Sequence, residues 1–442
     1  MNEIIVKTQE ELDNVPMDYH GRIIIKFGTW LNPAILRKSY DNARAVLRDN
    51  ASAELWGNAR AVLRDNASAE LWGNSRAVLR DNASAELWGN ASAVLWDNSR
   101  AVLRDNSRAV LRGNASAVLW DNASAVLRDN ASAELWDNAS AVLWDNASAA
   151  LWDNSRAELR DNASAELWDN ASAVLWGNSR AVLRDNASAE LRDNASAELW
   201  GNSSAELWGN SRAVLWGNSR AVLRDNASAE LWDNASAELR DNASAELWGN
   251  SRAVLRDNAS AELRDNASAE LWDNARAGAS GNAQIIDINR SSRASISGNA
   301  RVVYLPQNLE EFISHYGVQS DDVKVTLYKA VHREKGRYYS DYDTKYEYRI
   351  GETAVPDNGF DDDAHEKCGA GINMAPLHWC LDYGRKWSDL AILEMTALRE
   401  DVVVPMNTDG KVRARKAKVI REVPLSECGI YGEILAKRRA RN

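Results

Sequence analysis

The central half of this 442-residue chain lacks most of the side chains that carry out chemistry. Between Asn42 and Asp273 there is no His, Cys, Lys, Thr, Tyr, Phe or Met. Acid–base catalysis, nucleophilic catalysis and metal sites draw mainly on these residue types. We therefore exclude catalysis from this segment, and an enzymatic site would have to lie beyond it.

Cysteine, phenylalanine and long apolar runs are also scarce. The chain has 3 Phe against 19 Trp, a ratio that an ordinary globular core does not produce. Its three cysteines, Cys368, Cys380 and Cys428, are an odd number at spacings that suggest no disulfide framework, which fits a reducing compartment. The first residues lack the apolar core and cleavage site of a secretory signal, and no run is long enough to span a membrane. These features predict a soluble, cytoplasmic protein.

Net positive charge is absent as well. The chain carries −11, and the segment from 42 to 273 alone accounts for it with 23 Arg against 20 Asp and 14 Glu. The remainder of the chain sums to zero. Nucleic-acid binding by this segment is therefore not expected.

What fills the segment is one eight-residue unit, repeated 29 times with the consensus Asn-Ala-Ser-Ala-Glu-Leu-Trp-Asp. Counted from its Asn, positions 1, 4 and 6 are always Asn, Ala and Leu, and position 2 is Ala or Ser. Positions 3, 5 and 7 vary in size and charge. Because side chains alternate across a strand, positions 2, 4 and 6 are predicted to face inward and positions 3, 5 and 7 outward. Asp-Asn or Gly-Asn at the junction favours a tight turn.

So short a unit cannot bury a core alone, and successive coils must stack into a parallel β-solenoid. A helix is disfavoured because Leu would drift about 80° around it per octad. Two octads per 16-residue coil would set Leu at position 6 against Ala at position 2 and fill the interior evenly. A triangular 24-residue coil, the alternative, would leave its centre underfilled. In the first six octads position 7 alternates Arg and Trp, which a 16-residue coil would sort onto opposite sides: Arg48, Trp56, Arg64, Trp72, Arg80 and Trp88.

Octads come in two kinds, a basic one with Arg, Val and Arg at positions 3, 5 and 7, and an acidic one with Ser, Glu and Trp. Stacked coils would allow Arg–Glu pairs, Trp–Trp contacts and Arg over Trp. These ladders would hold the coils in register. Exposed Trp in this quantity also suggests a binding face for a protein partner, a second copy or a glycan. The six position-7 residues named above are the candidate binding residues.

The segments that flank the repeats are predicted to cap the rod, because an open solenoid end exposes unpaired strand edges. Residues 3–7 and 21–27 are expected to be strands, and Thr8 begins a capping-box helix. We divide the chain into an N-terminal cap, the octapeptide solenoid, irregular terminal coils and a C-terminal α+β domain: residues 1–41, 42–281, 282–305 and 306–442. Within the last, helices are predicted at 309–315 and 376–383, and strands at 323–331, 346–351, 390–394, 402–405 and 412–422.

Motifs at both ends resemble known families. Val-Lys-Thr-Gln-Glu-Glu-Leu-Asp at 6–13 and Gly-Arg-Ile at 21–23 resemble the caps of β-solenoid proteins encoded by phages and other mobile elements. Between 327 and 419, Leu-Tyr-Lys-Ala-Val, Tyr-Arg-Ile-Gly-Glu, Cys-Gly-Ala-Gly-Ile-Asn and Lys-Val-Arg-Ala-Arg-Lys-Ala-Lys-Val resemble an uncharacterised C-terminal domain found on pentapeptide-repeat and related phage solenoid proteins. The resemblance implies a phage-encoded, solenoid-associated domain with no assigned activity. His is common in that family where Asn373 stands here.

Candidate sites in the C-terminal domain centre on Cys368, Gly369, Gly371 and Asn373. Gly369-Ala-Gly-Ile resembles the Gly-x-Gly-Ile-Tyr-Phe segment of ADP-ribosyltransferases, whose glycines let the backbone approach a dinucleotide. The aromatic is missing here, and no clear Arg or His begins the first strand. A zinc set would combine thiolates with imidazoles at unfamiliar spacings, and satisfied core cysteines are the alternative. The members of that set would be His365, Cys368, His378 and Cys380.

Two basic runs, residues 411–418 and 437–441, suggest contact with nucleic acid or, for the first, the solvated face of an edge strand. The sequence as a whole predicts a non-enzymatic structural or interaction protein without cofactor or metal. It would be a rigid rod that displays Arg, Trp and Glu ladders and carries a C-terminal recognition or assembly domain. The alternatives are an ADP-ribosyltransferase-like enzyme carried on the rod, and an acidic DNA mimic that inhibits a DNA-binding enzyme.

Overall fold

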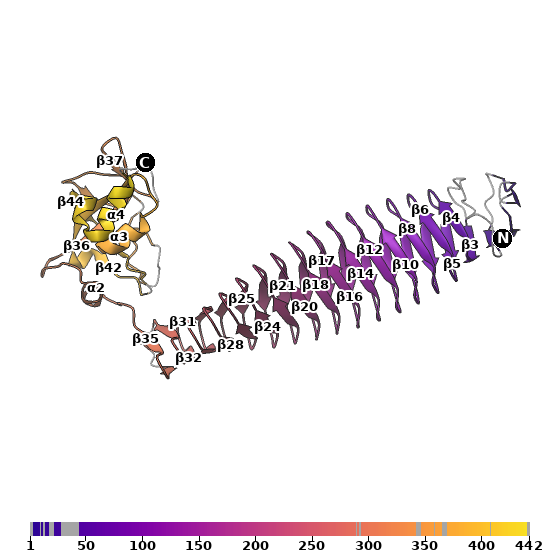
Figure 1. The fold of residues 1–442 in the computed structure, drawn as a ribbon, viewed down its shortest axis with the longest axis horizontal. Helices are drawn as coiled ribbons and strands as arrows, with labels where there is room; N and C mark the ends of the chain where they lie inside the picture. The colour runs from indigo at the N-terminus through magenta and orange to yellow at the C-terminus, as the bar shows by residue number, and fades with distance from the viewer. Residues whose placement is uncertain are drawn as a thin grey trace. The chain divides into compact units, whose positions relative to one another are not determined.

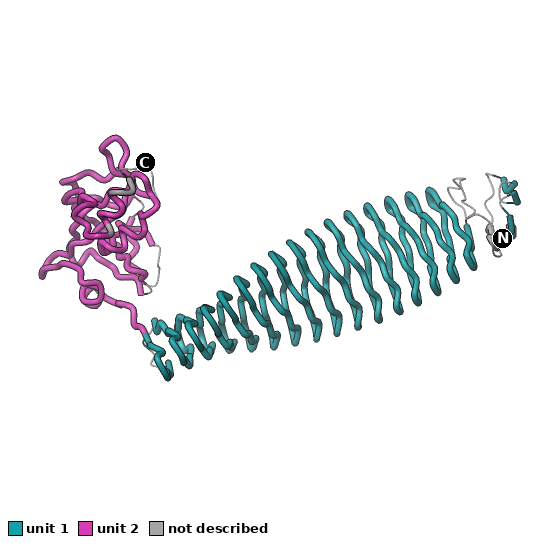
Figure 2. Tube along the Cα trace, viewed as in Figure 1, with its two compact units in different colours: residues 1–302 teal, residues 303–442 magenta. Residues whose placement is uncertain are grey.

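The computed structural model divides the chain into two compact units, residues 1–302 and 303–442 (Figure 2). The described residues are 3–8, 10–11, 14–16, 22–27, 44–288, 290, 293–341, 346–357, 359–364, 369–406 and 408–439.

Unit 1 is a parallel β-solenoid in which two octads make one coil (Figure 1). After β3 (Arg44–Asp49), strands β4 (Ser52–Leu55) to β31 (Ser268–Leu271) each cover positions 3 to 6 of successive octads. Every strand pairs in register with the strand two octads further along the chain, as Ala45 does with Ala61. Strands therefore sort into an odd sheet, which holds β1, β2 and the odd-numbered strands to β35, and an even sheet from β4 to β34. The 16-residue coil is confirmed, and the 24-residue alternative is wrong.

The turns between the sheets depend on position 8. All 20 Asp at this position have φ between 55° and 63°, a left-handed conformation that Asp tolerates better than most residues. Gly replaces Asp in the remaining octads. Most of these Asp also accept a hydrogen bond from the coil before them, as Asp65 Oδ2 does from Asp49 N at 3.3 Å. The following Asn donates its N–H to the preceding coil, with Asn66 N 2.9 Å from Asp49 O. The turns thus stack as regularly as the strands.

Alternation across each strand is confirmed. From Arg44 onward, Ala or Ser at position 2, Ala at position 4 and Leu at position 6 are buried in every octad, with the Leu side chains almost fully enclosed. Positions 3 and 5 lie half-buried or exposed on the outer face of each sheet, except for the buried Val46 in the first octad. One continuous Ala and Leu core therefore runs the length of the rod, and each coil contributes the same small volume to it.

Both ends of the rod continue its hydrogen-bond ladder. At the front, β1 (Glu3–Val6) pairs with β2 (Arg22–Phe27), which pairs in parallel with β3. Glu11 N donates to Thr8 Oγ1 at 3.2 Å, as the capping box predicts. At the other end β32 (Arg276–Ala279), β33 (Gln284–Asp287), β34 (Ala294–Ile296) and β35 (Arg301–Val303) are the last coils. They keep the stack but depart from the octad.

Unit 2 is built on an antiparallel sheet of six strands and a second sheet of three. The six-stranded order is β38 (Glu347–Tyr348), β37 (Arg337–Tyr339), β36 (Lys324–Glu334), β41 (Leu390–Leu398), β44 (Ala417–Val423), β39 (Thr353–Ala354). The three-stranded order is β40 (Ile372–Met374), β43 (Val412–Ala414), β42 (Val402–Val403). The helices are α2 (Leu309–Tyr316), α3 (Leu377–Tyr383) and α4 (Gly429–Arg439), and two 3-10 turns cover Arg399–Asp401 and Leu425–Glu427.

The predicted single strand from 412 to 422 is wrong in one respect. The chain leaves the small sheet after Ala414 and enters the large sheet at Ala417, so two strands replace one. Asp401 holds this crossing in place. Its carbonyl accepts from Arg415 N at 2.8 Å, and its carboxylate lies 3.7 Å from Arg415 Nε and 3.5 Å from Lys416 Nζ. The carboxylate comes from a distant turn, so no local pattern marks the break.

Candidate functional site

Tryptophan gathers along one edge of the rod. We call the row of position-7 residues that follow the even-sheet strands the Trp edge. They comprise 11 Trp and 3 Arg: Trp56, Trp72, Trp88, Arg104, Trp120, Trp136, Trp152, Trp168, Arg184, Trp200, Trp216, Trp232, Trp248 and Arg264. Neighbouring indoles stack face to face, with ring centroids 4.8 to 5.3 Å apart and planes within 12° of parallel. The predicted sorting of Trp and Arg thus persists well beyond the first six octads.

The three Arg of this edge end the Trp runs at a fixed interval of five coils. Arg104, Arg184 and Arg264 each place a guanidinium over the last indole of the run before them. The distances from Cζ to the ring centroids are 4.7, 4.6 and 4.3 Å. Each run is therefore capped by a cation–π contact.

The opposite edge has the inverse composition. Position 7 after odd-sheet strands holds 10 Arg and 5 Trp, and it includes the candidates Arg48, Arg64 and Arg80. Every Trp here has an Arg within cation–π distance, as Arg192 does over Trp176 at 4.6 Å. We call this the Arg edge. Arg240 also pairs with Glu238 at 2.7 Å, which raises the pKa of the Arg240 guanidinium.

Stacking restricts what the Trp edge can bind. A ring inside a run has both faces covered by its neighbours, so only its rim reaches solvent. The indole N–H groups of Trp72, Trp88, Trp136 and Trp232 are buried and have no acceptor among the described residues. The solvent-facing rim of these rings is therefore hydrocarbon. Sugar recognition usually needs a free aromatic face or a polar donor, and the rings inside the runs offer neither.

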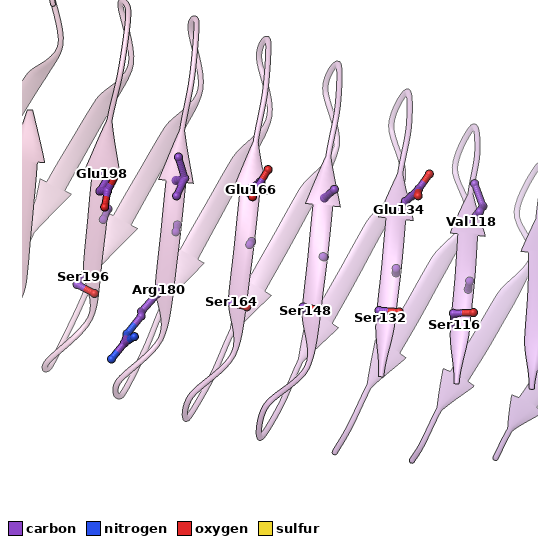
Figure 3. A pocket seen from close by; sticks show the side chains of 18 of the residues that line it. Ser116, Val118, Ser132, Glu134, Ser148, Ser164, Glu166, Arg180, Ser196 and Glu198 are labelled. Atoms are coloured by element: carbon purple, nitrogen blue, oxygen red, sulfur yellow. The ribbon is translucent and has the colours of Figure 1, made fainter. Parts of the chain in front are cut away.

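Each sheet adds a flat outer face with two rows of side chains. On the even sheet, position 3 forms a row of Ser interrupted by Arg100, Arg180 and Arg212, and position 5 forms a row of Glu and Val with one Ala; the two rows lie on either side of a shallow groove (Figure 3). On the odd sheet, Arg or Ser stands beside Val in seven consecutive coils, and all of these Val except Val46 line a second and mostly apolar groove. These Val are Val46, Val62, Val78, Val94, Val110, Val126 and Val142.

Charge is divided unequally between the two sheets. The octads of the even sheet contain 6 Arg, 9 Glu and 8 Asp, a net −11. Those of the odd sheet contain 17 Arg, 5 Glu and 12 Asp, a net zero. The net charge of the even-sheet octads thus equals that of the whole chain, and it combines a net −6 from positions 3 and 5 on the face with a net −5 from positions 7 and 8 at the edge.

In unit 2, the predicted glycines pack against other parts of the protein. A Cβ on Gly369 would overlap Asp361 Oδ2 and lie 2.5 Å from Arg413 Nη1, and one on Gly371 would lie 3.2 Å from Arg413 Cβ. Asn373 on β40 accepts a hydrogen bond through its carbonyl from Lys329 Nζ at 2.8 Å. Close internal packing thus accounts for glycine at 369 without a ligand.

The predicted metal set is not brought together in the part of the chain that the structure describes. His365 and Cys368 lie outside the described residues. His378 is exposed on α3, whereas Cys380 is buried two positions along the same helix, so the two side chains point to different sides. Burial raises the pKa of the Cys380 thiol to about 12. No group of three metal-ligating side chains occurs among the described residues.

The basic run from 411 to 418 does not lie on a solvated edge strand, so that expectation is wrong. β43 is the central strand of the small sheet, and Arg413 has no exposed surface. Its Nη2 donates to Asp363 O at 2.6 Å, and its Nη1 lies 4.0 Å from Asp361 Oδ2. A buried guanidinium needs such partners, and these come from a distant loop. The second basic run, 437–441, lies partly outside the described residues.

Sequence reasoning missed a polar cluster around His332 on β36. Its Nδ1 lies 2.9 Å from Asp389 Oδ1, and its Nε2 lies 3.2 Å from Asp341 Oδ1. The ring stacks on Trp387 with centroids 4.2 Å apart. Tyr383 donates its hydroxyl to Asp341 at 2.6 Å. Both imidazole nitrogens face carboxylates, so neither points toward an open position for a substrate, and the arrangement is an ion-pair cluster.

The His332 cluster makes the stability of unit 2 depend on pH. Desolvation lowers the pKa of His332, but the hydrogen bonds and charges of Asp389 and Asp341 outweigh it, so the folded pKa lies above 6.5. The protonated ring therefore stabilises the folded state below pH 6.5, and this contribution is lost as pH rises through the folded pKa. We expect His332→Gln to remove a pH dependence worth less than about 1 kcal/mol. Scanning calorimetry between pH 5.5 and 8.5 measures it.

His315→Gln, on the exposed surface of α2, is the matched control and should keep the pH dependence of the wild type. An unchanged pH profile in His332→Gln would contradict the assignment.

Lys329 lies near this cluster, on the same strand. Desolvation lowers the pKa of its ammonium to about 8, although part of the residue remains exposed. Its Nζ lies 5.4 Å from the centroid of the Tyr348 ring, besides its bond to the Asn373 carbonyl. Strand β36 thus places two perturbed cations, Lys329 and His332, on unit 2.

Comparison with protein families, curated proteins and solved structures finds no match to this chain. The class of protein therefore rests on its own geometry, which is that of a parallel β-solenoid with an α+β unit after it. Among the described residues, no helix is long and apolar enough to cross a membrane.

Proposed function

We propose that this protein is a non-enzymatic rigid rod that acts as a spacer and interaction surface, with unit 2 as its recognition or assembly domain. The observation that carries the proposal is the unbroken two-octad register of the array. Each coil makes the same ladder of hydrogen bonds and the same core contacts, so stiffness extends along the whole length. Partners of such a rod would meet repeated, flat or ridged surfaces.

Several features support a role in display. The octads keep nearly the same residues at the inward positions, whereas the residues at positions 3, 5 and 7, which face outward, differ between octads. The covered indole faces and buried N–H groups favour a protein partner over a glycan at the Trp edge. The ADP-ribosyltransferase-like alternative is weakened by the packing of Gly369 on Asp361 and Arg413. The DNA-mimic alternative remains a prediction.

A spacer should shorten in proportion to the coils removed. Deleting residues 106–185 removes ten octads, or five coils, and leaves every later octad on the same sheet as before. Spin labels at Ser84→Cys and Ser244→Cys, ten coils apart on the even sheet, should lie about 48 Å apart in the full chain and about 24 Å apart after the deletion. Double electron–electron resonance measures both, with the three native cysteines replaced by alanine.

Deletion of residues 106–113, a single octad, is the contrasting variant. It moves every later octad to the other sheet, so the two labels should lie on opposite faces. A deletion of 106–185 that unfolds the rod, or that leaves the distance unchanged, would contradict a modular rigid spacer.

A further inference from the structure

Like charges stack on each sheet near the front of the rod. On the even sheet Glu70 pairs in register with Glu86, and on the odd sheet Arg60 pairs with Arg76. Neighbouring strands lie about 4.8 Å apart, where like charges repel each other. None of these four residues forms an ion pair within the described part of the chain. Each ladder would therefore be stabilised by opposite charge from outside.

Beside the Arg row, the odd sheet carries its seven consecutive Val, and all except Val46 are partly exposed. A β-branched stripe that keeps contact with water on a flat sheet marks an interaction surface. In the corresponding row of the even sheet, six of the seven positions opposite these Val hold a small Ser, which leaves room for a side chain from a partner, and the seventh holds Arg100. The two outer faces of the rod are thus complementary in both charge and shape.

The two sheets also have the direction that such a fit requires. Strands of the front and back sheets point in opposite directions (Figure 3). If a second rod is moved along the sheet normal without rotation, its odd sheet meets the even sheet of the first with antiparallel strands. Position 3 then faces position 5. Arg60 and Arg76 of one copy would face Glu70 and Glu86 of the other, and Val62 would face Ser68.

The same register extends along the array. Six of the seven Arg in the odd-sheet row would face Glu, and the seventh, Arg108, would face Val118. Position 3 is never Glu and position 5 is never Arg, so no two like charges face each other. The six pairs are Arg44 with Glu54, Arg60 with Glu70, Arg76 with Glu86, Arg156 with Glu166, Arg220 with Glu230 and Arg252 with Glu262.

We infer that the partner of these faces is a second copy of this chain, bound with its odd sheet on the even sheet of the first. The inference rests on the proposed interaction role and names its partner. Fourteen coils of four-residue strands offer about 900 Å² per face, or about 1,800 Å² in total, the size of a stable interface. The contact joins two different faces, so it leaves one face free at each end and copies add side by side.

Two charge-reversed proteins test the contact. Arg60→Glu with Arg76→Glu makes both faces acidic, and Glu70→Arg with Glu86→Arg makes both basic. Sedimentation velocity of the full chain in low salt should show wild-type mass rising with concentration beyond a dimer. Each variant alone should associate at least about tenfold more weakly, because like charges then face each other. An equimolar mixture should restore association.

Asp322→Lys with Glu433→Lys on unit 2 is the matched control, since it changes net charge by the same +4 as the basic variant. It should associate as the wild type does. Circular dichroism verifies folding. Should the basic variant fail to fold, Ser68→Arg with Ser84→Arg replaces it, because position 3 accepts Arg in other octads.

A wild type that stays monomeric would overturn the inference, as would equal weakening by the control. Loss of association only in the acidic variant would also overturn it, in favour of a two-fold contact between odd sheets. The label distances that test the rigid spacer are measured in high salt on single rods. The result of the distance measurement therefore does not depend on whether the rods associate.

Discussion

Leu151→Asp is expected to destabilise the rod by roughly 4 to 5 kcal/mol, because it buries an unpaired carboxylate in the Ala and Leu core. Leu151 has no exposed surface and stacks between Leu135 and Leu167. Solenoid stability is a sum of coils and their interfaces, so damage to one coil also weakens both contacts with its neighbours. Denaturant unfolding followed by circular dichroism should show a lower midpoint and a broader or split transition.

The adjacent residue provides the control. Ala150→Asp introduces the same carboxylate at position 5, which faces outward and carries Glu in many octads. Its effect should stay at about 1 kcal/mol, because only the like charges of Glu134 and Glu166 on the neighbouring strands oppose it. Equal losses from the two variants would show that the strand does not alternate as described.

Trp152→Ala is expected to cost about 2 kcal/mol, the second-largest effect, because a large aromatic side chain is removed from a partly buried stack. The Trp152 ring lies between Trp136 and Trp168, with centroids 5.1 and 5.0 Å away. Its removal loses two stacked contacts and the burial that they provide. A fully buried Trp would cost about 3 to 5 kcal/mol, and partial exposure reduces this value. Unfolding by denaturant gives the loss, and near-ultraviolet circular dichroism reports the interrupted stack.

Trp152→Arg is the matched substitution, because Arg interrupts the Trp runs naturally. Arg104 shows the geometry, 4.7 Å from Trp88 and 5.9 Å from Trp120. Two cation–π contacts should restore about half of the loss. If Arg proves no better than Ala at position 152, the natural Arg do not stabilise the ends of the runs as we describe.

The coil was predictable because its causes are local and repeat. Invariant Leu at position 6 and Ala at position 4 reveal the buried side of the strand, and Asp or Gly at position 8 reveals the turn. Volume then selects two octads per coil over three, since two Ala and one Leu fill only a thin interior. Even the division of charge and the five-coil spacing of Arg104, Arg184 and Arg264 are readable in the sequence once position 7 is compared in every second octad.

Unit 2 was less predictable because distant residues determine it. Its helices and main strands follow local patterns, as at α2, where Asn308 caps the helix. The buried Arg413 resembles a surface residue in sequence, and only the Asp363 carbonyl and the Asp361 carboxylate explain its burial. His332 and Asp389 are 57 positions apart, and the pairing of β36 with β41 brings them together.

The sequence by itself therefore determined the repeat, the interior, the turn and the absence of His, Cys, Lys and Tyr from the array. Tertiary structure decided which outward side chains become neighbours. In the folded rod, Trp stacks on Trp along one edge and Arg gathers along the other. The face with the Arg and Val rows and the face with the Ser and Glu rows lie on opposite sides of the rod. The physical reason is that burial acts on each residue where it stands, whereas a surface exists only after coils that are far apart in the chain have stacked.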